Sequence, residues 1–314
     1  MEKDNVEPLY VPINIDVAIR YHRFFDVRFF IKKRMGDMIS IHQKAIFLEK
    51  TFKSYKAKGL REIWLLNEDY HRIVGELRHS LETKKDFRAA FHDINSIYSL
   101  SRNILLEHGF NKKVLEESRS LNIIAIKHIL EVPDLASLMV NFKKENDAFF
   151  FRYIMQSYII NSMIKTFPWY SEQLMIKMGE ACMLCDITLS ESDFDHMERF
   201  PMDKWTKKQL HHPIEVAEML RKYGKDISPD VIKVIEQHHE KPDGTGYPSG
   251  LTHSHFTLLS SIFQISAEVA RKLENVDART FDMDFLVQEI YQNNQKGVCR
   301  NASMALFSSL GLQL

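Results

Sequence analysis

The sequence predicts a mainly α protein with a smaller α/β domain at its N-terminus. At 314 residues the chain exceeds the usual size of one domain, which favours two folding units. Short β-like runs occur in the first 85 residues, whereas helical patterns dominate the rest of the chain. We therefore expect a small α/β module of unknown role over residues 1–85, a helical connector over residues 86–148 and an all-helical domain over residues 149–314.

Three β-like runs and one helix define the expected N-terminal module. The runs cover residues 27–31, 38–42 and 62–66, and the helix covers residues 44–58. Gly59 supplies a helix stop before the last run. The aromatic and basic side chains of residues 21–25 could line a ligand site, but half-buried strand packing is the preferred interpretation. No site is assigned to this module.

Helical spacing continues through the connector and the C-terminal domain. The apolar residues that show it in the connector are Ile94, Ile97, Leu100, Ile104 and Leu105. Gly109 and Pro133 break this pattern. After Phe149, the long loop rich in glycine and proline covers residues 242–250. We expect the chemistry of the protein to concentrate at this loop.

Composition and charge exclude several classes of protein. The hydrophobic fraction of 45% and the charged fraction of 27% are ordinary for globular chains and exclude wholesale disorder. A formal net charge of zero gives no overall field for a nucleic acid polymer or an anionic membrane. The apolar run at residues 149–164 is too short to span a bilayer. With three cysteines and no secretory signal pattern, we expect a cytoplasmic protein.

Two adjacent histidines lie at the expected end of a helix. Ser228 and Pro229 are good N-cap and first-turn residues, and apolar side chains at helical spacing carry this helix to His238. Neighbouring helical residues point about 100° apart. His238 and His239 can therefore converge on one ion only where the helix ends and the backbone turns. Such a pair alone is more often a surface or packing feature than a metal ligand.

The loop after the histidine pair carries a longer motif. Gly244 and Gly246 permit positive φ, and Pro248 stiffens the backbone. Residues 238–248 resemble, without a gap, the HD-GYP signature HHE-x-x-DG-x-GYP, and His212 followed by proline is similar to that family's lone metal-binding histidine. The signature residues beyond the histidines are Glu240, Asp243, Gly244, Gly246, Tyr247 and Pro248.

The resemblance covers roughly residues 149–314 and implies an all-helical domain of the HD phosphohydrolase superfamily. HD-GYP domains typically hydrolyse the bacterial messenger cyclic di-GMP with two or three metals, which absorb the charge that develops on the phosphate. The resemblance places the family's second metal site on Asp186, His212, His238 and His239. Three imidazoles and one carboxylate suit Zn, Fe or Mn, so the expected cofactor is one divalent transition metal.

The same alignment leaves the family's first metal site incomplete. Its three further ligand positions fall on Tyr153, Cys185 and Ala267, and the phosphate-contacting lysine falls on Leu189. The arginine-containing motif expected after the last ligand is not recognisable around residues 275–281. Loss of one preorganised charge-stabilising donor costs about a hundredfold to a thousandfold in rate. We therefore expect catalysis to be weak or absent.

Cys182 and Cys185 form a C-x-x-C pair with three interpretations. Redox chemistry is disfavoured because no βαβ pattern surrounds the pair. A Cys185 thiolate could act with Asp186 as a soft ligand in an unusual first site, although two ligands are too few without help. Packing as small hydrophobic side chains in a helix is the preferred interpretation.

We expect a degenerate HD-GYP protein that binds metal and acts as a non-catalytic or weakly catalytic regulator in bacterial cyclic di-GMP signalling. The family suggests cyclic di-GMP, a GGDEF-domain protein or a second copy of the chain as partners. One alternative is an active metal-dependent cyclic di-GMP phosphodiesterase whose first metal is rebuilt from Glu268, Glu180 or Cys185. The other is a purely structural metal in a closed four-coordinate site.

Overall fold

A computed structural model describes residues 10–21, 27–33, 36–41, 45–85, 87–108, 112–133, 138, 148–224, 227–274 and 282–312. The chain divides into two compact units. The first unit joins residues 1–85 with 89–109, and the second joins residues 86–88 with 110–314. Residues 22–25, from the aromatic and basic segment, and residues 275–281 lie outside the described residues.

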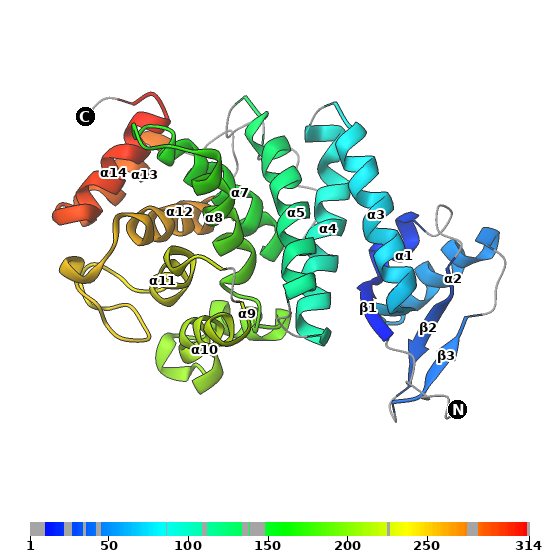
Figure 1. Ribbon diagram of the computed structural model, residues 1–314. Coiled ribbons are helices and arrows are strands. Elements are labelled where there is room, and N and C mark those ends of the chain that lie inside the picture. The colour runs from blue at the N-terminus through cyan, green and yellow to red at the C-terminus, as the bar shows by residue number, and fades with distance from the viewer. Residues whose placement is uncertain are drawn as a thin grey trace. The chain divides into compact units, whose positions relative to one another are not determined.

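The first unit contains a four-stranded antiparallel sheet in the order β1-β4-β2-β3 (Figure 1). Its strands are β1 (Tyr10–Asn14), β2 (Phe29–Lys32), β3 (Met38–Ser40) and β4 (Glu62–Leu66). The three strands expected from the sequence are confirmed, and β1 is an addition. Pro12 lies in β1 opposite Trp64 of β4. Proline has no backbone N–H to donate to a neighbouring strand, so it is tolerated in an edge strand such as β1.

Helices complete the first unit. They are α1 (Ile15–Tyr21), α2 (Ala45–Ala57), α3 (Asn67–Thr83) and most of α4 (Phe87–His108). The buried face of α3 repeats at helical spacing, from Tyr70 through Leu77 to Leu81. Ser80 Oγ donates to Asp93 Oδ2 of α4 at 2.7 Å, and the Tyr70 hydroxyl donates to a backbone carbonyl of α4 at 3.3 Å. The pair α3 and α4 is therefore antiparallel.

Within the described residues, the regular elements of the second unit are all helical. The α-helices are α5 (Lys112–Leu130), α7 (Ala148–Ile164), α8 (Glu172–Leu184), α9 (Glu191–Arg199), α10 (Lys207–Tyr223), α11 (Pro229–Gln237), α12 (Leu258–Glu274), α13 (Met283–Asn293) and α14 (Gly297–Ser309). The mainly α fold is thus confirmed. Helix α7 contacts α5, α8, α12 and α14 (Figure 1), which explains why it is apolar on nearly all sides. No described helix is long and apolar enough to cross a membrane.

The expected connector, residues 86–148, is divided between the two units. Most of α4 belongs to the first unit, whereas α5 belongs to the second. Helix α5 lies close against α8 because Gly179 has no side chain: a Cβ there would lie 1.8 Å from Ile126 Cδ1. The Tyr153 hydroxyl of α7 also donates to Asn122 of α5. Helix α5 is therefore an integral part of the second unit.

A buried ion pair joins α5 to α8. The Arg119 guanidinium donates to both carboxylate oxygens of Glu180, at 2.9 and 3.1 Å, and the Glu180 side chain is only 2% exposed. Burial raises the pKa of Glu180 above its ordinary value, although the hydrogen bonds and charge of Arg119 oppose that rise. The arginine therefore offsets part of the free-energy cost of burying the Glu180 carboxylate in the core.

Arg119→Ala should lower the free energy of unfolding by about 3 kcal/mol near neutral pH, because it leaves a buried carboxylate without its cation. The change also raises the folded-state pKa of Glu180 further above its unfolded value. Stability linked to such a group is present at low pH and is lost as the pH rises through the folded pKa. Urea unfolding should therefore show that the loss of unfolding free energy in Arg119→Ala, relative to wild type, becomes smaller as the pH is lowered from about 8 to about 5.

The double variant Arg119→Ala, Glu180→Gln serves as the matched control, since its amide stays neutral at every pH used. Its deficit should vary much less with pH than that of Arg119→Ala. A deficit in the single variant that stays constant across this range contradicts the assignment to Glu180.

Candidate metal centre

Four candidate ligands come together in the second unit: Asp186, His212, His238 and His239. We call them the Asp–His cluster; one ligand atom from each lies within 4.8 Å of the others. His212 Nε2 is 3.1 Å from Asp186 Oδ1 and 3.2 Å from His238 Nε2. His238 Nε2 and His239 Nε2 are 3.3 and 3.8 Å from the same carboxylate oxygen. Ligands about 2.1 Å from a tetrahedral ion lie roughly 3.4 Å apart, so this spacing suits one transition metal.

His212 is held in one tautomer by the backbone of α10. This helix begins with a capping box between Thr206 and Gln209, and His212 follows on its buried face. His212 Nδ1 lies 2.7 Å from the carbonyl oxygen of Gln209. A carbonyl oxygen can only accept, so Nδ1 carries the proton and Nε2 turns its lone pair toward the cluster.

His238 is held in the same way at the end of α11. It is the C-cap residue of that helix, and its Nδ1 lies 2.7 Å from the carbonyl oxygen of Ile235. The last carbonyls of a helix have no partner within the helix, so one of them is available to the imidazole. Both buried histidines therefore present Nε2 as an acceptor or ligand atom.

This arrangement of atoms suits a cation. The Nε2 atoms of His212 and His238 cannot donate to each other, and the oxygen of Asp186 that they share also only accepts. His239 Nε2 is buried and has no hydrogen-bond partner within the described part of the chain. Lone pairs held this close repel one another unless a positive charge lies among them. The residues present therefore fit a divalent metal ion.

The pKa shifts of Asp186 and His239 favour metal binding too. Burial lowers the pKa of His239 well below its ordinary value, and the neighbouring His238 acts in the same direction. Burial alone would raise the pKa of Asp186, but the close approach of His212, His238 and His239 lowers it well below its usual range. Metal ligands must be neutral imidazoles and ionised carboxylates, and these shifts leave the groups in those states at neutral pH.

Two of the four side chains in the cluster are partly exposed. The side chains of His212 and His238 are 0% and 3% exposed, whereas those of Asp186 and His239 are 23% and 30% exposed. Asp186 follows the C-terminal end of α8, and His238 caps the C-terminal end of α11. The His239 Nε2 atom that faces the cluster is itself buried, so the exposed parts of these two side chains lie away from the ligand atoms of His212 and His238.

Glu240 organises the signature loop. Its side chain is buried, and its two carboxylate oxygens accept from the backbone N–H groups of Ser249 and Leu251 at 2.7 and 2.8 Å. Asp243 Oδ1 accepts from the backbone N–H and the hydroxyl of Thr245. These hydrogen bonds fold the loop back on itself, so neither carboxylate belongs to the cluster.

The glycines of the loop are required for different reasons. Gly244 has a φ of 82°, which side chains other than glycine rarely adopt. At Gly246 an added Cβ would lie 2.2 Å from the backbone nitrogen of Lys241 and within 2.6 Å of Glu240 backbone atoms. The loop can therefore close over its own start only with glycine at position 246.

Tyr247 holds His239 in place. Its backbone N–H donates to the carbonyl of His239 at 3.1 Å, and the two rings stack with centroids 4.6 Å apart at 19°. The Tyr247 hydroxyl is buried without a hydrogen-bond partner among the described residues, and burial raises its pKa. Tyr247 thus forms a wall of the centre, and the cis peptide bond to Pro248 follows it.

The positions where the resemblance predicts missing ligands lie outside the cluster. Tyr153 and Leu189 are buried, Ala267 is half-buried on α12, and the Tyr153 hydroxyl donates to Asn122. Cys185 is buried, with Sγ 3.7 Å from the Cys182 carbonyl and 3.6 Å from Asp186 Oδ2. Burial raises the pKa of the Cys185 thiol well above its ordinary value. It is thus protonated at neutral pH and a poor ligand.

The two glutamates considered for a rebuilt first metal also lie outside the cluster. Glu180 is paired with Arg119, and Glu268 Oε2 accepts from Gln264 at 3.4 Å. Among the described residues, the Asp–His cluster is the group of His, Cys, Asp and Glu side chains spaced to hold an ion.

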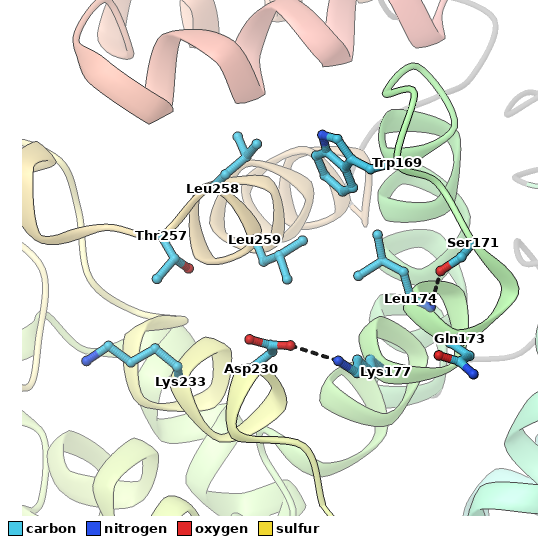
Figure 2. A pocket seen from close by; sticks show the side chains of 10 residues that line it. All are labelled: Trp169, Ser171, Gln173, Leu174, Lys177, Asp230, Lys233, Thr257, Leu258 and Leu259. Carbon is cyan, nitrogen blue, oxygen red and sulfur yellow. Dashed lines mark hydrogen bonds and ion pairs between the residues drawn. The ribbon is translucent and has the colours of Figure 1, made fainter.

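A separate cavity of about 440 Å³ lies at the opposite ends of two helices that lead to the cluster (Figure 2). Its lining includes Trp169, Leu174 and Lys177 near the start of α8, Asp230 at the start of α11 and Leu258 at the start of α12. Lys177 forms an ion pair with Asp230 at 2.8 Å. No residue of the Asp–His cluster lines this cavity.

The second unit combines a helical fold with the Asp–His cluster and the glycine-rich loop. The chain is similar to the solved structure of Bd1817, a HDG"Y"P protein from Bdellovibrio bacteriovorus, with 16% sequence identity and a TM-score of 0.61. The match covers 96% of this chain and 100% of that chain, so it extends beyond residues 149–314. This likeness confirms the HD-GYP-type fold. No family model matches the sequence, and no curated protein matches it.

Sequence reasoning missed the backbone carbonyls of Gln209 and Ile235, which hold the two buried histidines. Every residue has a backbone carbonyl, so residue identity does not show which carbonyls accept from a side chain. The capping box from Thr206 to Gln209 is a signal that could have located the start of α10.

Glu240→Gln should lower the free energy of unfolding by about 1–3 kcal/mol, because the new amide NH₂ faces a backbone N–H and leaves that donor unsatisfied. Asp243→Asn is the matched control, since a single oxygen of Asp243 accepts both loop bonds and the asparagine oxygen can replace it. Urea unfolding of both variants measures the difference. Equal losses in the two variants would contradict this assignment of roles.

Proposed function

We propose that the chain is a degenerate HD-GYP protein that binds one divalent transition metal, Fe, Mn or Zn, at the Asp–His cluster. It acts as a non-catalytic or weakly catalytic regulator or adaptor in bacterial cyclic di-GMP signalling. A bound ion supplies Lewis acidity toward a phosphoryl group. In-line displacement of a phosphodiester also needs charge stabilisation at the leaving oxygen, which a second metal normally provides.

The packing at the missing ligand positions carries this proposal. Tyr153 and Leu189 are buried in the core, with the Tyr153 hydroxyl bonded to Asn122, and the Cys185 thiol is buried beside a backbone carbonyl. These side chains are part of the fold, so a second ion would need the core to rearrange. A single metal site therefore favours binding over turnover.

Two alternative functions of the same centre are an active phosphodiesterase and a purely structural metal site. An active phosphodiesterase is favoured by the intact signature loop, in which Glu240 and Asp243 keep their hydrogen bonds. A purely structural metal would favour a closed site, whereas Asp186 and His239 are partly exposed. The partial exposure of these two side chains favours a centre that meets an external ligand.

The proposed partners follow from the family and from the chemistry of the centre. Cyclic di-GMP would meet the metal through its phosphates, and a GGDEF-domain protein or a second copy of the chain would dock on the protein surface. The three cysteines, Cys182, Cys185 and Cys299, are free and buried. Free thiols agree with the proposed cytoplasmic location.

Purified protein should bind one Zn²⁺, Mn²⁺ or Fe²⁺ per chain, because its ligand atoms form a single cluster. Metal analysis after dialysis and calorimetric titration of the metal-free protein measure the stoichiometry. His212→Ala and the double change His238→Ala, His239→Ala should weaken binding at least tenfold. Tyr153→Phe is the control and should leave the metal affinity unchanged. Two tightly held ions per chain would overturn the single-site proposal.

Purified protein should hydrolyse cyclic di-GMP at least a hundredfold more slowly than a complete HD-GYP enzyme, because charge-stabilising groups are missing. The assay supplies Mn²⁺ or Fe²⁺ and separates linear and mononucleotide products by chromatography. Robust turnover that disappears in Asp186→Ala would show that the chain is an active phosphodiesterase.

A further inference from the structure

Helix α10 contains a proline in its interior. Pro213 lies in the second turn of a helix that runs from Lys207 to Tyr223, and its side chain is buried. An interior proline removes one helical hydrogen bond and crowds the carbonyl four residues earlier, which makes it the most unfavourable residue for that position. A proline in this place therefore needs a compensating role.

The affected carbonyl belongs to Gln209, four residues before Pro213. In an uninterrupted helix the N–H of residue 213 would donate to that oxygen. Proline has no N–H, so the ladder leaves the oxygen without this partner. The same oxygen accepts the Nδ1–H of His212 at 2.7 Å. The residue next to the metal ligand thus frees the acceptor that fixes the ligand's tautomer.

Gln209 is itself held rigidly. Its side-chain oxygen accepts from the Thr206 backbone N–H at 2.8 Å and from His196 Nδ1 at 3.1 Å. Its side-chain amide donates to the Asp193 carbonyl at 2.9 Å. Because these bonds tie α10 to α9, the Gln209 carbonyl is a fixed point against which the imidazole of His212 is oriented.

We propose that Pro213 is a positioning residue of the metal centre: by withholding a backbone N–H, it reserves the Gln209 carbonyl for His212 and aims Nε2 at the ion. The inference rests on the metal site of the proposed function. Helix α11 reaches the same result without a proline in its interior, because His238 uses a carbonyl at the helix end. His212 lies in mid-helix, so it needs the interruption.

The test compares Pro213→Ala with Pro229→Ala in the full chain. Pro229 occupies the first turn of α11, the helix that carries His238, where a missing N–H interrupts no helical bond. Zn²⁺ is titrated into each metal-free protein in competition with a chromophoric chelator, and the Tm of each metal-free protein is measured. Wild-type protein is titrated first, so failure of the metal site itself is seen independently.

Two effects of opposite sign are expected for Pro213→Ala. The restored N–H competes with His212 for the Gln209 carbonyl, so the Kd for Zn²⁺ should rise about tenfold or more. The restored helical bond should raise the Tm of the metal-free protein by about 2–4 °C. Pro229→Ala should leave the Kd for Zn²⁺ within about twofold of wild type.

A merely structural proline predicts a different result. Unchanged Zn²⁺ affinity in Pro213→Ala would overturn the proposal, as would a lower Tm of the metal-free protein together with the weaker affinity. If Pro213→Ala does not fold, Pro213→Ser also restores the N–H and is judged by the same two measurements. Nitrogen NMR of the imidazole gives an independent readout, in which the fraction of His212 protonated at Nδ1 should fall in the variant.

Discussion

Four electron-pair donors that face one another across less than 5 Å are the constraint around which the second unit is arranged. Without a cation these atoms repel, so the rest of the fold must hold them together. Helix α10 fixes His212 through a backbone carbonyl, α11 fixes His238 through another, and the signature loop stacks Tyr247 on His239. Helix packing and loop hydrogen bonds offset the repulsion among these atoms. A metal ion would relieve part of that repulsion on binding.

The positions where the resemblance implies further metal ligands are packed into the core of the second unit. In a domain that held two ions, the inner face of α7 and the segment after α8 would carry polar ligands. Here Tyr153 and Leu189 lie there, and α5 seals the other side of α7 and α8 through Gly179 and the Arg119–Glu180 pair. The side chains at these positions are therefore part of the packed core that joins α5, α7 and α8.

Much of the site could be predicted from sequence because its residues are marked by identity. Histidines, the aspartate and the glycine-rich loop carry their chemistry in their side chains, and the structure brings the four ligands together. The strand β1 escaped notice because Pro12 is unusual in a strand and is tolerated at an edge. The connector could not be divided by pattern alone, since α4 and α5 are both amphipathic and pack on different partners. Carbonyl acceptors and loop closure depend on backbone geometry, which residue identity does not encode.

Two helices end at the cluster, with Asp186 following α8 and His238 capping α11. The C-terminal end of a helix carries about half a negative charge, so both macrodipoles add to the carboxylate. Before an ion arrives, the centre is a pocket of negative potential that draws cations and repels phosphates. The charge of a divalent ion would offset that of the carboxylate and the two helix ends. An anionic ligand would therefore meet less repulsion at a metal-loaded centre than at a metal-free one.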